Sequence, residues 1–227
     1  MQRKKLILWS ALGAAMAAAL VVHFNETTAA SVRNFGMINT PLGRVQLICA
    51  VIPWLLFSFY WEAAAKNVAA ASSSESKSSR GIHVLLGNLA LVLEIVQIRA
   101  LGRFLPVSYL TIAAGLAVEL IGLSIAIWAR RSLGRNWSGE VSIKVEHQLI
   151  RSGPYRFVRH PIYTGLLALY AGTAVVSGTW LAVAGFALAL FAYFRKLRLE
   201  EARLREFFGA EYDSYRRDTW ALVPGLI

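Results

Sequence analysis

Long apolar segments with at most one charged residue each constrain this chain more than any other feature. They occupy residues 6–24, 45–61, 81–98, 105–129 and 161–194. Hydrophobic residues make up 56% of the chain and charged residues 16%, whereas a soluble domain carries about a quarter charged residues. The length of the segments and this composition predict a protein that spans a membrane several times.

The last apolar segment is too long for one crossing. As a single helix, residues 161–194 would extend roughly 50 Å, against a hydrocarbon core of about 30 Å. Ser177 and Gly178 form a turn signal near its middle. We therefore expect a helical hairpin there, and in total an all-α, polytopic membrane helical bundle of about six segments.

Polar stretches separate these segments. Residues 62–80 contain a serine-rich run and predict a hydrophilic loop, and the charged tail 195–227 begins as a continuation of the last helix. The basic residues Arg3, Lys4 and Lys5 before the first apolar segment also fit a signal peptide. The length of segment 6–24 and the lack of an obvious cleavage site favour a spanning helix instead. We expect two regions, the N-terminal membrane helices at 1–130 and a functional region at 131–227.

Charge predicts the orientation in the membrane. The net charge is +11, and residues 130–160 carry seven lysines and arginines against two glutamates, a net +5. Basic residues beside membrane segments favour the cytoplasmic side, so both termini and this loop are expected there. Arg99 and Arg103 on the opposite side are a minor conflict with this rule. The charge pattern indicates membrane orientation rather than nucleic-acid binding, and the single Cys49 allows no internal disulfide.

Two polar stretches flank the hairpin. The first, His147 to Gly165, reads HQLIRSGPYRFVRHPIYTG; the second runs from Arg195 through Glu200 and Glu201 to Tyr215. Taken alone, the first fits a juxtamembrane segment with interfacial arginines and tyrosines, and the second a solvated helix with ion pairs four residues apart.

Taken together, these stretches resemble the isoprenylcysteine carboxyl methyltransferases and their bacterial and archaeal relatives. The resemblance covers roughly the last 90 residues in the order and spacing of that family. It rests on His147, Leu149, Gly153, Tyr155, Arg159-His160-Pro161, Tyr163, Gly165, Glu200-Glu201, Phe208-Gly209, Glu211-Tyr212, Tyr215 and Pro224. It implies an integral membrane methyltransferase that uses S-adenosylmethionine, with the cofactor pocket at the cytoplasmic surface.

The resemblance also implies roles for individual residues. The expected cofactor contacts are Glu140, His147, Gln148, Leu149, Ile150, Tyr155, His160, Pro161, Ile162, Tyr163 and Glu200. The expected catalytic residues are Arg159, Lys196, Glu200 and Glu201, and the substrate would contact Arg195 and Lys196. Lys196 stands where the eukaryotic enzymes have a substrate-binding arginine. Lysine keeps the positive charge but cannot form the two parallel hydrogen bonds that arginine makes to a carboxylate, so the identity of the methyl acceptor stays open.

The expected reaction is O-methylation of a carboxylate on a lipophilic small molecule or a lipidated substrate in the membrane. A carboxylate is ionised near neutral pH and needs alignment rather than a general base. An amine or thiol acceptor would need a base, for which only His160 and Glu201 are candidates. Neither a metal nor a nucleic acid is expected. Two alternatives remain open, an NADPH-dependent sterol-type reductase with a similar C-terminal signature and a membrane protein without enzymatic activity.

Glu94 and Glu119 lie within apolar segments. An ionisable group at membrane depth is a functional candidate, and a protonated or paired carboxyl within the bundle is the simpler interpretation.

The charge pattern generates a topology prediction. Reporter fusions at 25–43 and 99–104 should read as external, and fusions within 130–160 as internal, because basic loops stay in the cytoplasm. Alkaline phosphatase and fluorescent protein fusions measure this. An external 130–160 loop would contradict the orientation, since it would separate the expected pocket from a cytosolic cofactor.

Overall fold

The computed structural model describes residues 40–64, 71–74, 76–97, 101–134, 137, 142–144 and 149–226. Its main elements are α2 (Pro41–Ala64), α3 (Lys77–Ile95), α4 (Tyr109–Leu133), α5 (Pro161–Ser177), α6 (Trp180–Phe208) and α7 (Ala210–Asp218). A short 3₁₀-helix (Gly153–Arg156) and the strands β1 (Ala71–Ser74) and β2 (Ser142–Lys144) complete them. The helical architecture predicted from the apolar segments is therefore confirmed, and the predicted first segment, 6–24, lies outside the described residues.

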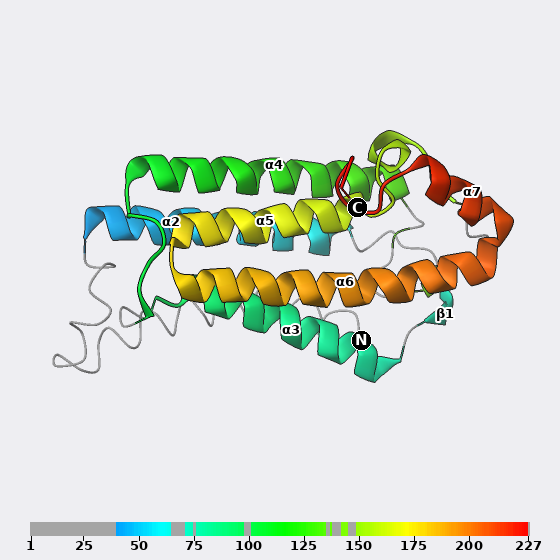
Figure 1. Cartoon of the computed structure of the whole chain (residues 1–227), viewed down its shortest axis with the longest axis horizontal. Coiled ribbons are helices and arrows are strands. Elements are labelled where there is room, and N and C mark those ends of the chain that lie inside the picture. Colours follow the sequence, from blue (N-terminus) through cyan, green and yellow to red (C-terminus); the bar gives the residue numbers. More distant parts are fainter. Residues whose placement is uncertain are drawn as a thin grey trace.

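The long helices run side by side. Figure 1 shows α4 lying along α5, and α6 lying along α3, with α7 and the end of the described chain gathered at one end of the bundle. Among the described residues, three helices are long and apolar enough to cross a membrane, namely α2, α4 and α6, and α5 is a shorter apolar helix. The protein is an integral membrane protein, while the number of six spans stays a prediction.

The predicted hairpin is present, and glycine forms its turn. Helix α5 ends at Ser177, Gly178 adopts a left-handed conformation with φ of +66°, and Thr179 caps α6 by accepting a hydrogen bond from the Ala182 N–H. Only glycine adopts this conformation without strain. Helix α6 then continues to Phe208, well past the apolar stretch that ends at Phe194, as expected for a helix that leaves the membrane.

The region predicted as one hydrophilic loop, residues 62–80, has more structure than its polarity suggested. Ala71–Ser74 pairs antiparallel with Ser142–Lys144, and α3 already begins at Lys77. The side chain of Ser76 accepts a hydrogen bond from the Ser79 N–H, which satisfies a free donor of the first helical turn. A serine run is compatible with both a loop and a helix cap, so the pattern alone did not separate them.

Helices α4 and α5 touch through glycines, so their backbones approach closely. A Cβ atom built on Gly122 would lie 2.5 Å from the Gly165 carbonyl oxygen, and one on Gly172 would lie 2.7 Å from the Gly115 oxygen. In lipid, such close packing is a main source of helix association because apolar burial gives no advantage there. These contacts fix where α5 begins relative to α4.

We therefore predict that Gly122→Ala destabilises the bundle by about 1–3 kcal/mol, since the new methyl group must push α5 away. Thermal unfolding in detergent measures it. The matched control is Gly81→Ala on α3, where a Cβ meets no atom within 4 Å and should leave stability unchanged or raise it. Equal melting temperatures for both variants would show that the close approach does not hold the helices together.

Candidate functional site

The candidate site lies where the segment before α5 meets the polar half of α6. Gly153, with φ of +61°, allows the chain to turn against α4 and begins the short 3₁₀-helix, in which Pro154 and Tyr155 are buried. Pro161 then starts α5 at a position where its missing N–H is not needed. These local features place Arg159, His160 and Tyr163 beside α6.

The C-terminal tail fastens this segment. The Trp220 carbonyl accepts a hydrogen bond from the Arg159 N–H at 2.8 Å, and the Ala221 carbonyl accepts one from the His160 N–H at 3.0 Å. Thr164 Oγ1 donates to the Leu222 carbonyl at 2.7 Å. Residues 220–222 therefore form a strap across the start of α5, and the site depends on the tail.

Glu201 is the electrostatic centre of this arrangement. Its carboxylate accepts a hydrogen bond from Arg159 Nε at 2.8 Å and lies 3.4 Å from His160 Nε2. Arg216 of α7 lies 3.7 Å away, and Arg159 also donates to the carbonyls of Arg216 and Thr219. Glu201 thus joins α6, the start of α5 and the tail.

These contacts keep Glu201 ionised. The residue lies beyond the apolar part of α6, seven positions past Phe194. Burial alone would raise the pKa of its carboxyl group, but His160 and Arg159 outweigh that effect and lower the pKa to about 2. A carboxylate with so low a pKa is a very weak base near neutral pH.

Glu200, its neighbour on the helix, faces a different partner. The Tyr163 hydroxyl donates a hydrogen bond to Glu200 Oε2 at 2.5 Å, and His160 Nδ1 lies 3.7 Å from the same oxygen. The imidazole of His160 is stacked parallel to the Tyr163 ring, with the ring centroids 5.4 Å apart. The Glu200 side chain is 32% exposed, compared with 15% for Glu201, so Glu200 has a face open to a ligand.

Lys196 lies one helical turn before Glu200 and on the same face. Its ammonium nitrogen lies 5.8 Å from the centroid of the Tyr163 ring, so a cation, a carboxylate and an aromatic face meet at this point. Arg195 points to another side of α6, where it donates hydrogen bonds to Ser79 at the start of α3. The structure therefore separates the two residues that were predicted to contact the substrate.

The other predicted cofactor residues divide into two groups. Those that the structure describes are buried or half-buried: Leu149, Ile150, Tyr155, Pro161 and Ile162. Glu140, His147 and Gln148 lie outside the described residues. The Tyr155 carbonyl accepts a hydrogen bond from the Tyr215 hydroxyl at 2.6 Å, which shows why that tail tyrosine accompanies the motif.

Sequence reasoning missed two contributors, Arg216 and the strap residue Trp220. Neither has a distinguishing local pattern, and their roles depend on how the tail folds back. Among the described residues, no group of three or more histidines, cysteines or carboxylates is placed to hold a metal ion.

Glu94 and Glu119 lie away from this site, fully buried within the bundle. Thr173 Oγ1 lies 2.6 Å from Glu119 Oε1 and accepts a hydrogen bond from Trp54 Nε1 at 2.9 Å. Neither carboxylate oxygen of Glu94 has a hydrogen-bond partner within the described part of the chain. A role in substrate handling stays a prediction.

The fold and the site define a helical integral membrane protein whose polar chemistry gathers at one end of the bundle. Comparison with known proteins shows which proteins part of this chain resembles. Residues 110–211 match the model of the phospholipid methyltransferase family. A probable protein-S-isoprenylcysteine O-methyltransferase of Oryza sativa is 37% identical over 113 residues, which cover 48% of this chain and 59% of that protein.

Two further comparisons were found. The protein-S-isoprenylcysteine O-methyltransferase of Schizosaccharomyces pombe is 34% identical over 94 residues, covering 40% of each chain. A solved eukaryotic Ras methyltransferase, isoprenylcysteine carboxyl methyltransferase, aligns over 98% of this chain and 97% of its own, with a TM-score of 0.46 and 16% identity. The chain matches less than two thirds of the length of these curated relatives. The resemblance to the isoprenylcysteine carboxyl methyltransferases is confirmed over about half of the chain.

The contacts of Glu201 generate a pH prediction. Because the folded-state pKa of Glu201 is lowered from 4.5 to about 2, its contribution to stability is fully present above pH 4.5 and is lost as pH falls towards 2. Glu201→Gln should therefore lower the melting temperature at neutral pH, and the difference from the unmodified protein should shrink below about pH 4.5.

Thermal unfolding in detergent between about pH 3 and about pH 8 measures this. The matched control is Glu206→Gln, an exposed carboxylate on the same helix, which should change little at any pH. A Glu201→Gln difference that stayed constant across this range would contradict an ionic role.

Proposed function

We propose that this protein transfers a methyl group from S-adenosylmethionine to the carboxylate of a lipophilic acceptor in the membrane. The observation that carries the proposal is the pairing of Lys196 and Glu200 on one face of α6, both against Tyr163. The names of the relatives supply the reaction class, because they are protein-S-isoprenylcysteine O-methyltransferases.

The residues around the start of α5 fit the cofactor. Glu200 is a partly exposed carboxylate that can accept hydrogen bonds from an ammonium group, and the faces of Tyr163 and His160 can contact a sulfonium or an adenine ring. His160 is buried, and its Nε2 lies 3.4 Å from Glu201 Oε1, which holds the imidazole ring in place. When bound, S-adenosylmethionine supplies an electrophilic methyl group. Leu149, Ile150, Tyr155, Pro161 and Ile162 would enclose the rest of it, with Glu140, His147 and Gln148.

The state of Glu201 favours a carboxylate acceptor. An amine or thiol must lose a proton to react well, and Glu201 with a pKa of about 2 accepts protons poorly. Its oxygens are also engaged by Arg159. A carboxylate acceptor avoids this requirement, since it is ionised near neutral pH. The site then has to orient the acceptor and exclude water from it.

Lys196 is the residue that orients the acceptor. Its ammonium group can hold one carboxylate oxygen while the other approaches the methyl carbon. Arg159 was predicted to be catalytic, but its guanidinium faces Glu201 and the tail carbonyls. Arg159 therefore acts by positioning the site, and Lys196 provides the contact with the acceptor.

The two substrates differ in polarity and need separate entrances. S-adenosylmethionine is water-soluble and would enter from the cytoplasmic side, where the 131–160 segment and the charged tail lie in our orientation. A lipophilic acceptor gains about 0.8 kcal/mol for each methylene kept out of water, so it would enter laterally from the bilayer. Its head would stop at Lys196, beside the membrane surface.

The two alternatives have less support. The relatives are named as methyltransferases, which does not favour an NADPH-dependent reductase. The cation and carboxylate that converge on Tyr163 also favour a binding site over a membrane protein without enzymatic activity.

We predict opposite effects for two variants on one face of α6. Glu200→Gln should weaken binding of S-adenosylmethionine by roughly tenfold, because it removes a charge-assisted hydrogen bond. Lys196→Ala should leave that affinity nearly unchanged and should raise the KM for the acceptor. Isothermal titration of the purified protein measures the first effect, and transfer of radiolabelled methyl groups to membrane lipid extracts measures the second.

Glu206→Gln is the control, since it removes a carboxylate from an exposed position of the same helix. If Lys196→Ala abolished cofactor binding while acceptor use per bound cofactor stayed intact, the assigned roles would be wrong. Absence of any S-adenosylmethionine binding by the unmodified protein would reject the proposed function.

A further inference from the structure

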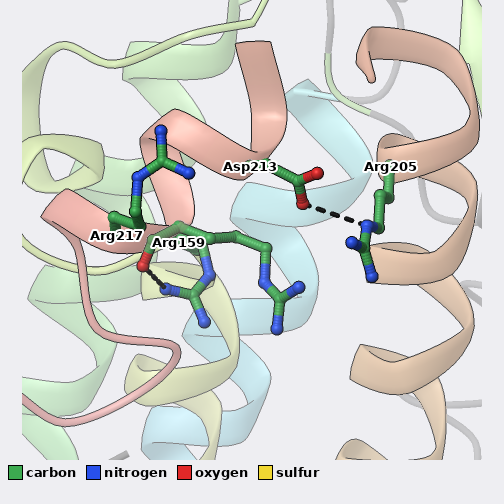
Figure 2. A pocket seen from close by; sticks show the side chains of 5 residues that line it. Arg159, Arg205, Asp213 and Arg217 are labelled. Carbon is green, nitrogen blue, oxygen red and sulfur yellow. Dashed lines mark hydrogen bonds and ion pairs between the residues drawn. The ribbon is translucent and has the colours of Figure 1, made fainter. Parts of the chain in front are cut away.

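A recess lined by four arginines lies beside the candidate site, on the side of the tail. Its lining residues are Arg159, Arg205, Asp213, Arg216 and Arg217, and its volume is about 380 Å³. Figure 2 shows Arg205 projecting from α6 towards Asp213 of α7, with Arg159 and Arg217 across the recess from Arg205. The recess shares only Arg159 with the predicted site residues.

The structure holds several of these arginines in place. Arg159 is fixed by Glu201 and by carbonyl oxygens of the tail, and Arg205 Nε lies 3.0 Å from Asp213 Oδ1. A guanidinium group that is already oriented loses less conformational freedom when it binds a ligand. The arginines therefore form a preorganised frame contributed by the α5 entry segment, α6 and α7.

Positive charge in this recess exceeds the negative charge available to balance it. Asp213 is the single carboxylate in the lining, and it pairs with Arg205. Within the described part of the chain, Arg217 forms neither a hydrogen bond nor an ion pair. Arg216 is exposed and lies 3.7 Å from Glu201, which Arg159 already engages. The recess therefore favours an anion.

The arrangement of the donors indicates the class of anion. A carboxylate presents two oxygens in one plane and is satisfied by one guanidinium fork. Here the guanidinium groups come from three separate elements, which suits an anion whose oxygens point in several directions. A phosphate group has this geometry, and arginine is a preferred residue for phosphate recognition. The volume also leaves room for a group attached to the phosphate.

Two exposed aromatic residues are linked through backbone hydrogen bonds to Arg159 of the recess. The backbone N–H of Trp220 donates a hydrogen bond to the Phe157 carbonyl at 3.2 Å, and both side chains are about half exposed. Arg159, which lines the recess, is bonded through its backbone N–H to Trp220. Tryptophan is enriched at the headgroup level of membranes, so an anionic lipid is a candidate source of the phosphate beside a soluble phosphate ester.

We propose that the recess between α6 and α7 is a binding site for a phosphate group, separate from the site of methyl transfer. The phosphate belongs either to an anionic phospholipid headgroup or to a soluble phosphate ester. The proposal rests on the arginine geometry and does not depend on the methyltransferase assignment.

The experiment uses the full-length protein in nanodiscs and has two arms. In the lipid arm, native mass spectrometry measures bound phosphatidylglycerol when it is mixed into phosphatidylcholine. In the soluble arm, isothermal titration measures glycerol 3-phosphate binding in phosphatidylcholine alone, with acetate as a carboxylate comparison. The test variant combines Arg205→Gln and Arg217→Gln, which leaves Arg159 and Glu201 intact.

We expect binding in at least one arm, weakened roughly tenfold in the test variant because charge-assisted hydrogen bonds are lost. The control combines Arg198→Gln and Arg131→Gln, two exposed arginines outside the recess, and should bind as the unmodified protein does. Lipid-only binding identifies a headgroup site, and soluble binding identifies a phosphate ester site. No binding in either arm, equal losses in test and control variants, or acetate binding as tight as phosphate binding would overturn the proposal. S-adenosylmethionine affinity, measured in parallel, tests the methyltransferase assignment separately.

Discussion

The ionic contact between Glu201 and Arg159 is the interaction on which the site depends. Helix α6 leaves the apolar part of the bundle carrying Glu201, and the chain enters α5 immediately after Arg159. A buried carboxylate is costly unless it is paired, so each residue constrains the other. Arg159 also binds carbonyls of the tail, and the strap at Trp220 fixes its backbone. Two helix ends and the tail are thus held by one pair of charges.

The membrane part of the fold could largely be read from the sequence. The hairpin followed from an apolar run too long for one crossing, and its turn falls at Gly178 as expected. The same patterns could not show that Ala71–Ser74 pairs with Ser142–Lys144, because those short polar segments lie about 70 residues apart. They also could not show the close contact of Gly122 with Gly165, since glycines in membrane helices have several possible roles.

The sequence predicted which residues form the candidate site better than it predicted the directions of their side chains. The motif located His160, Tyr163 and Glu200 in one place, and the structure brings them into contact. It did not reveal that Arg159 faces the tail or that Arg195 faces Ser79. The direction of a long side chain depends on partners distant in sequence. For Arg159 those partners include the carbonyl of Thr219, 60 residues further along the chain.

The helical repeat of α6 explains how one helix contributes to both proposed sites. Lys196 and Glu200 are four residues apart and face Tyr163, whereas Glu201 and Arg205 follow the same spacing on a neighbouring face and meet Arg159 and Asp213. Adjacent glutamates therefore have different roles because each residue turns about 100° around the axis. Glu201 is occupied by protein partners, and Glu200 keeps a face open to a ligand.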